Sequence, residues 1–138
     1  MTSESDLAEQ IKLRMFPEAP REVVLNLPLC PSVWDLYRPA KRGQRRPRTP
    51  EYEAWIKEAG WELARQRPPR VPGKVVLLIE VGEIGIKALA DCTNRVKAPE
   101  DLLVSHGIIQ GDDRRFVREV TVRWAQIKGL RVTIRAAE

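Results

Sequence analysis

The apolar run at Lys74–Val81 is the feature that most restricts what this chain can fold into. It reads Lys-Val-Val-Leu-Leu-Ile-Glu-Val, with a single acidic interruption near its end. A nearly continuous apolar run of this kind is typical of a central strand that is covered on both faces. The chain has 138 residues, which is enough for one domain with one modest core. We therefore expect a single domain built around this strand.

The segments before this run predict one further strand and one helix. Val23, Leu25 and Leu27 alternate with other residues, as in a strand, and Pro28 stops it. Thr49-Pro50-Glu51 is a favourable helix start, and Arg67-Pro68-Pro69 ends the helix. The apolar residues at helical spacing, which should form its buried face, are Tyr52, Trp55, Ile56, Ala59 and Leu63.

The segments after the run predict a second helix and two closing strands. The helix should lie between Thr93 and His106 with Gly107 at its end, and Pro99 requires it to start late or to bend. Residues 120–124 and 130–134 alternate as strands, and the short link 126–129 predicts an antiparallel hairpin. The fold class is therefore α+β, with a small mixed sheet and two main helices.

The N-terminal residues 1–21 are interpreted as an extension ahead of the main domain, which spans residues 22–138. Residues 3–16 could form a short helix that ends at Pro17. The chain shows neither an apolar run of about 20 residues nor the pattern of a signal peptide, so we expect a cytoplasmic protein with no membrane partner.

Cysteine and histidine content limits the metal chemistry. Cys30 and Cys92 match no metal-binding spacing and should be free thiols in a reducing compartment, and His106 is the single histidine. A metal would therefore be held mainly by oxygen ligands, which favours a hard cation such as Mg²⁺.

Positive charge is concentrated in residues 38–48. The formal net charge is +5, and this segment holds six basic residues and no acidic one, so the remainder is close to neutral. A local basic patch suits nucleic acid, although a solvated loop or a targeting signal would look the same. We assign phosphate contacts to the whole group, which comprises Arg38, Lys41, Arg42, Arg45, Arg46 and Arg48. Trp34 and Tyr37 flank it and would either stack on unpaired bases or pack in the core or in a subunit interface.

Acidic residues cluster at two places in the second half of the chain. Asp91 opens the stretch Asp-Cys-Thr-Asn-Arg-Val-Lys, which ends at Lys97, and Asp112-Asp113 follows about one helix later. Converging carboxylates could hold Mg²⁺, which can polarise a phosphate and activate water, and Lys97 could bind the phosphate. Without further information, caps, turns and solvated charges explain the same residues.

Taken together, these motifs resemble the RusA family of Holliday junction resolvases over residues 22–136. The resemblance rests on Pro31–Arg38, the basic loop, Thr49–Trp55, the Asp91–Lys97 stretch and His106–Ile109 followed by Asp112-Asp113. It implies a RusA-like homodimer that cuts four-way DNA junctions by paired, Mg²⁺-dependent hydrolysis, with Mn²⁺ as a substitute. It also implies a role in DNA recombination and repair and a phage or prophage origin.

Carried over by position, Asp91 is the first metal carboxylate and Lys97 the catalytic lysine. The last carboxylate falls on Asp112 or Asp113. When residues are counted from Asp91 along the family motif without a gap, the last carboxylate falls on Asp112. When Gly111 is treated as an insertion, it falls on Asp113 and the apolar Phe116 is better placed, so we prefer Asp113. The neighbouring residues expected to contact DNA are Lys87, Asn94 and Arg95.

Thr93 departs from the family pattern, because it stands where many members carry a second aspartate. A hydroxyl is a poorer Mg²⁺ ligand than a carboxylate, and it would also make a good helix cap. Either the site works with fewer carboxylates, or the protein is a weak or inactive relative that binds branched DNA. A basic RNA-binding domain is a further alternative.

Overall fold

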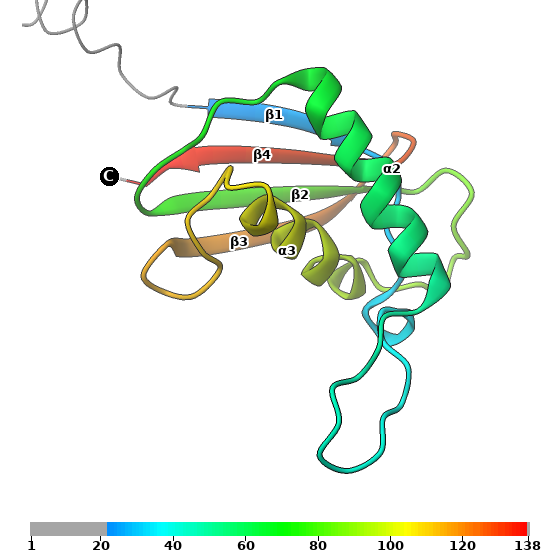
Figure 1. Cartoon of the computed structure of the whole chain (residues 1–138). Coiled ribbons are helices and arrows are strands. Elements are labelled where there is room, and N and C mark those ends of the chain that lie inside the picture. Colours follow the sequence, from blue (N-terminus) through cyan, green and yellow to red (C-terminus); the bar gives the residue numbers. More distant parts are fainter. Residues whose placement is uncertain (1–21, 138) are drawn as a thin grey trace, which may run out of the picture.

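The structure is a computed structural model, and it describes residues 22–137. In these residues, four strands form one mixed sheet in the order β1-β4-β2-β3. The strands are β1 (Glu22–Leu27), β2 (Val75–Gly82), β3 (Val117–Ala125) and β4 (Leu130–Ala136). The helices are α2 (Pro50–Gln66) and α3 (Lys97–Ser105), with short 3-10 turns η1 (Val33–Asp35) and η2 (Cys92–Arg95). The α+β class with a mixed sheet and two main helices is confirmed (Figure 1). The helix expected at residues 3–16 lies outside the described residues.

Helix α2 begins and ends where the sequence predicts. The Thr49 hydroxyl accepts a hydrogen bond from the Tyr52 amide at 3.2 Å, which satisfies an amide that has no partner inside the helix. Arg67 closes the helix in the left-handed region at φ 48° and donates its amide to the Leu63 carbonyl. The predicted apolar face is buried, apart from a half-buried Ile56. Trp61, on the other side of α2, is 72 % exposed.

The predicted closing hairpin is wrong. Strand β2 lies between β3 and β4 and pairs with β3 in parallel and with β4 antiparallel. The short link from β3 to β4 passes over the end of β2, where the Gly82 amide donates to the Gly129 carbonyl at 2.8 Å. A Cβ atom at Gly82 would lie 2.3 Å from the Ile127 carbonyl oxygen, so this crossing requires a glycine. The most apolar strand thereby gains a hydrogen-bonded neighbour on both sides.

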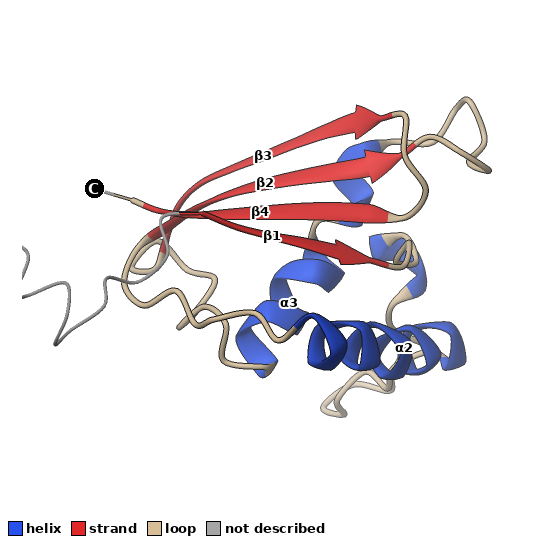
Figure 2. Cartoon of the chain, turned by 90° about the horizontal axis from the view of Figure 1, so that it is seen from above, coloured by secondary structure: helices blue, strands red, loops and turns tan. Residues whose placement is uncertain are grey.

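Both helices lie on one side of the sheet (Figure 2). On that side Val75, Leu77, Ile79 and Val81 of β2 are fully buried in the core. The expectation that β2 is covered on both faces is therefore wrong: no helix or strand of residues 22–137 covers the other side. We call that side the open face, and its residues are Glu22, Val24, Asn26, Val76, Leu78, Glu80, Glu119, Thr121, Arg123, Arg131, Thr133 and Arg135.

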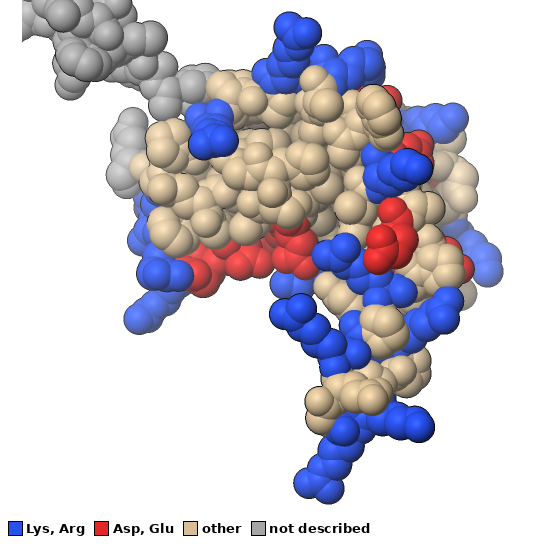
Figure 3. Space-filling model, in the orientation of Figure 1, with Lys and Arg blue, Asp and Glu red and all other residues tan. Residues whose placement is uncertain are grey.

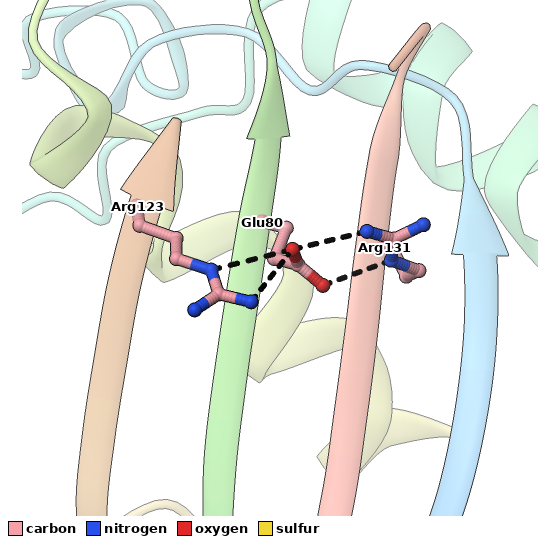
Figure 4. A network of polar contacts seen from close by, with 3 residues as sticks. All are labelled: Glu80, Arg123 and Arg131. Carbon is pink, nitrogen blue, oxygen red and sulfur yellow. Dashed lines mark hydrogen bonds and ion pairs between the residues drawn. The ribbon is translucent and has the colours of Figure 1, made fainter. Parts of the chain in front are cut away.

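Glu80 ties three strands together on the open face. Its carboxylate accepts hydrogen bonds from Arg131 of β4 at 2.8 Å and from Arg123 of β3 at 3.1 Å (Figure 4). The side chain of Glu80 is only 7 % exposed. Hydrogen bonds from Arg131 and then from Arg123 lower the pKa of Glu80 to about 2, against the opposing effect of burial. The acidic interruption in the apolar strand is thus a paired structural charge.

Helix α3 starts late, at Lys97, which is one of the two outcomes that Pro99 allowed. Pro99 then lies in the first turn, where its missing amide hydrogen costs no helical hydrogen bond. Gly107 follows the helix at φ +70°, as its position predicted. Among residues 22–137, no helix is both long enough and apolar enough to span a bilayer.

Candidate functional site

The basic segment forms a two-armed loop that we call the basic hairpin (residues 37–48). Tyr37 and Arg48 form an isolated antiparallel bridge at its base, and the Arg38 amide donates to the Pro47 carbonyl at 2.8 Å. Gly43 lies at the tip with φ +83°, a conformation that suits glycine. The hairpin projects beyond the β3 edge of the sheet (Figure 1). Its basic residues are all exposed.

Two of the six basic side chains brace the hairpin, and the others are uncommitted. Arg46 donates to the Arg38 carbonyl at 3.3 Å, and Arg48 lies over the Tyr52 ring with its guanidinium carbon 5.8 Å from the centroid. Within residues 22–137, no ion pair compensates the charges of Arg38, Lys41, Arg42 and Arg45. The hairpin therefore presents unbalanced positive charge to solvent.

The two aromatic residues beside the hairpin have different environments. Trp34 in η1 is 79 % exposed. Tyr37 is half-buried and packs edge-on against Tyr52, with ring centroids 5.7 Å apart. Packing therefore explains Tyr37, while Trp34 remains available to stack on a base.

A cluster of charged side chains lies beside the hairpin, on α3 and the loop that follows it. The Lys97 ammonium lies 3.1 Å from a carboxylate oxygen of Asp101 and 3.6 Å from one of Asp112. The hydrogen bond to Asp101 is the main cause of a raised Lys97 pKa. Glu100 is half-buried, and burial, followed by the nearby Asp112 charge, raises its pKa. We call Lys97, Glu100, Asp101 and Asp112 the acidic cluster. Figure 3 shows acidic side chains at the lower edge of the body, beside the blue hairpin.

The structure gives different partners to Asp112 and Asp113, the two aspartates that the sequence offered for the last carboxylate. Asp112 faces Lys97, whereas the Asp113 carboxylate accepts hydrogen bonds from the Arg115 amide and guanidinium at 2.9–3.0 Å. These bonds hold the Asp113 pKa at about 2. The arrangement is a surface turn, and it favours Asp112 over Asp113 for the last carboxylate, an assignment that stays a prediction.

One cavity of about 330 Å³ joins the base of the hairpin to the acidic cluster. Its wall is made by the hairpin, by α2, by α3 and by the loop after α3. The lining residues are Tyr37, Arg48, Tyr52, Ile56, Asp101, Leu102, Val104, Ser105 and Asp112. A second, larger hollow of about 760 Å³ lies against Arg45, Arg46 and Arg48. A phosphate held at the hairpin base would thus be next to Asp101 and Asp112.

Asp91 and Thr93 lie at the start of η2, and both are exposed. Thr93 is not the helix cap that we considered, because Val96 occupies the N-cap position of α3 and no side chain caps that end. Among the described residues, neither the Asp91 carboxylate nor the Thr93 hydroxyl has a hydrogen-bond partner. Both oxygens are therefore uncommitted.

The remaining predicted DNA contacts have different outcomes. Arg95 donates from its guanidinium to the Cys30 carbonyl, and the Cys30 thiol lies 3.5 Å from the Arg95 carbonyl, so Arg95 fastens η2 to the turn after β1. Its contact with DNA stays a prediction. Asn94 is half-buried beside it, and Lys87 is exposed in the loop after β2, against a separate cavity of about 340 Å³.

A metal would have to be held by few protein ligands. Residues 22–137 contain no group of three or more acidic, cysteine or histidine side chains placed to hold one ion. Asp91 and Asp112 nevertheless offer carboxylate oxygens, the ligands that Mg²⁺ prefers. Mg²⁺ commonly uses one or two carboxylates and completes its shell with water and substrate phosphate. Asp112 and Asp101 line one cavity and fit this pattern, whereas Asp91 does not line that cavity.

Asp101 and Glu100 were missed by the sequence analysis. The spacing from Lys97 to Asp101 is four residues, which on a helix places the two side chains on the same face. This spacing was a usable signal, but ordinary surface pairs give it as well.

Comparison with models of known protein families finds no match, and a search of curated proteins finds no relative.

Proposed function

We propose that this protein is a metal-dependent endonuclease that cuts branched DNA, of the kind that resolves four-way junctions. The observation that carries the proposal is the cavity of about 330 Å³ that Arg48 of the hairpin shares with Asp101 and Asp112. A strand whose phosphates bind the basic hairpin would run directly past the acidic cluster. Binding and hydrolysis would then occupy adjacent parts of one surface.

The proposed chemistry assigns a role to each group. The uncommitted arginines and Lys41 bind backbone phosphates without reading sequence. Asp112 would hold Mg²⁺ in the cavity. The family resemblance assigns Asp91 as the other carboxylate, with Thr93 as its neutral neighbour. When bound, such an ion polarises the phosphate and lowers the pKa of water. The Lys97 ammonium, 3.1 Å from Asp101, is available to stabilise charge that develops on the cleaved phosphate.

A homodimer is part of the proposal. A four-way junction has near two-fold symmetry and needs two opposed cuts, and two-fold dimers are the commonest oligomers. One chain presents one hairpin and one acidic cluster, so two copies would supply the two sites.

The test uses a labelled four-way junction and a linear duplex of the same sequence, each with Mg²⁺ or with EDTA. We expect paired nicks in the junction only with Mg²⁺. Asp91→Asn and Asp112→Asn should abolish nicking while junction binding in a gel shift persists. Asp113→Asn is the matched control and should nick at the wild-type rate, because Asp113 is engaged by Arg115. Equal loss in Asp112→Asn and Asp113→Asn would contradict the assignment.

A second candidate is a junction-binding relative that cuts slowly or not at all. It is favoured by Thr93, which adds no negative charge at a place where a further carboxylate would strengthen metal binding. This candidate predicts tight junction binding without nicks, and nicking that appears or rises in Thr93→Asp. Nicking by Thr93→Ala at the wild-type rate would exclude the hydroxyl as a ligand. A preference for RNA over junction DNA would refute both candidates.

A further inference from the structure

Three basic side chains gather at the end of the sheet where β2 and β3 begin. Arg70 and Lys74 belong to the loop from α2 to β2, and Arg114 belongs to the loop from α3 to β3. All three are exposed, and within the described part of the chain none of them forms an ion pair. Asp113, the neighbour of Arg114 in the chain, is already paired with Arg115 at 2.9 Å. We call Arg70, Lys74 and Arg114 the distal patch.

The two loops that carry the distal patch are fastened to each other. The Gly73 amide donates a hydrogen bond to the side-chain oxygen of Gln110 at 2.7 Å. The Arg70 guanidinium lies over Gly107, 3.9 Å from the point where a Cβ atom of that residue would be. Val71, which follows Arg70, is fully buried and anchors its loop in the core. The charges therefore stand on a fixed backbone, so binding a ligand there would require little ordering of the loops.

The distal patch and the basic hairpin lie at opposite ends of the sheet. Strands β1, β2 and β3 run in the same direction, because β4 is antiparallel to both β1 and β2, and β3 is parallel to β2. The hairpin follows the end of β1, whereas the loops of the distal patch lead into the starts of β2 and β3. Figure 3 shows acidic side chains along the lower edge of the body, with basic side chains beyond them at its left end and the hairpin on the other side.

The acidic cluster by itself repels a DNA strand. It holds three acidic side chains and one lysine, and every phosphate of the strand is negatively charged. A strand held at the hairpin alone would be pushed away from this surface. Arg114 lies two residues beyond Asp112, so a strand that passes the acidic cluster meets positive charge directly afterwards. Cations on both sides would hold the strand across the cluster.

We propose that the distal patch binds the backbone phosphates of a DNA arm that has passed the acidic cluster. The hairpin binds the same arm on the other side, so the two basic surfaces hold the DNA across the place of hydrolysis. The contacts recognise charge and carry no information about base sequence. The distal patch takes this role from the proposed function, on which the inference rests, and it adds a second DNA-binding surface to it.

The test measures the affinity of the full chain for a fluorescently labelled four-way junction and for a linear duplex, by anisotropy in EDTA at several salt concentrations. The double variant Arg70→Gln, Arg114→Gln removes one charge from each loop. It should bind both DNAs about tenfold more weakly at about 0.1 M salt. The slope of log K against log salt should fall by about 2, since each phosphate contact contributes about 0.9.

The matched control is the double variant Arg65→Gln, Lys128→Gln. It removes the same charge at exposed positions of α2 and of the link from β3 to β4, away from the distal patch. Its salt slope should equal that of the wild type. All four side chains are exposed, so both double variants should melt with the wild type when followed by circular dichroism.

Two results would overturn the inference: an Arg70→Gln, Arg114→Gln variant that keeps the wild-type salt slope, or a control that loses as much slope. These results are distinct from a failure of the nuclease proposal, because EDTA prevents metal-dependent cutting. A chain that never nicks DNA but loses affinity in the first double variant supports the distal patch alone. A chain that nicks junctions and binds equally well in both double variants supports the nuclease alone.

Discussion

Replacing Glu80 by glutamine should destabilise the protein in a pH-dependent way. The substitution removes the carboxylate that holds Arg123 and Arg131, and it leaves two guanidinium groups without their partner. A pKa that falls from 4.5 to about 2 on folding corresponds to at most about 3 kcal/mol at neutral pH. The arginine side chains are 60 % and 38 % exposed, so water screens part of this. We expect a loss of about 1–2 kcal/mol, or roughly 5 °C in Tm.

The sign of the pH dependence follows from the depressed pKa. The folded carboxyl stays ionised below its unfolded pKa, so its contribution is complete above about pH 4.5 and is lost as the pH falls towards 2. The wild type and Glu80→Gln should therefore differ most at pH 7 and converge near pH 2. Urea unfolding followed by tryptophan fluorescence at both pH values measures this gap.

Glu58→Gln is the control, because Glu58 is exposed on α2 and forms no ion pair with any described residue. It should change the free energy of unfolding by less than about 0.5 kcal/mol. The free energy of unfolding of Glu80→Gln could instead be lower than that of the wild type by the same amount at pH 7 and near pH 2. That result would show that the shape of the side chain, and not its charge, causes the loss of stability. The absence of any gap at pH 7 would refute the role of the network.

Three further predictions follow. Gly82→Ala should cost about 3 kcal/mol in urea unfolding, since its Cβ atom would lie 2.3 Å from the Ile127 carbonyl oxygen. Gly60→Ala is the control, because Gly60 also lacks a positive φ and its Cβ atom would have no neighbour closer than 3.5 Å. The Cys30 thiol should resist thiol reagents in the native state, because burial raises its pKa to about 12, and labelling as fast as in urea would contradict this. Replacing Arg38, Lys41 and Arg42 by glutamine should weaken binding to all DNA and reduce the salt slope by about 2–3, whereas an unchanged slope would remove the hairpin from the interface.

Local patterns determined the individual elements. Thr49 and Pro50 fixed the start of α2, Pro99 and Gly107 bounded α3, and alternation marked the strands, because caps, backbone restrictions and side-chain periodicity act within a few residues. The concentration of charge in residues 38–48 was equally visible from the sequence.

Local patterns failed where partners come from distant parts of the chain. The short link after β3 predicted that β3 and β4 pair with each other as a hairpin. In the structure the apolar strand β2 lies between them and pairs with both, and this sets the strand order. The apolar run itself gave no sign that one face of β2 would stay open, because that depends on where both helices pack. Nothing in the sequence indicated that Arg95 donates a hydrogen bond to the carbonyl of Cys30, 65 residues away.

The candidate site shows the same division. The sequence by itself determined which residues bring chemistry: a basic segment, the aspartates at 91, 112 and 113, and Lys97. The spacing of Lys97 and Asp101 on α3 already allowed them to pair, but only the tertiary structure decided that Asp112 also faces Lys97 while Asp113 turns to Arg115. It alone placed Arg48 beside Asp101 and Asp112 in one cavity. The physical reason is that residue type and spacing set what a side chain can do, whereas the packing of α2, α3 and the hairpin base sets which side chains meet.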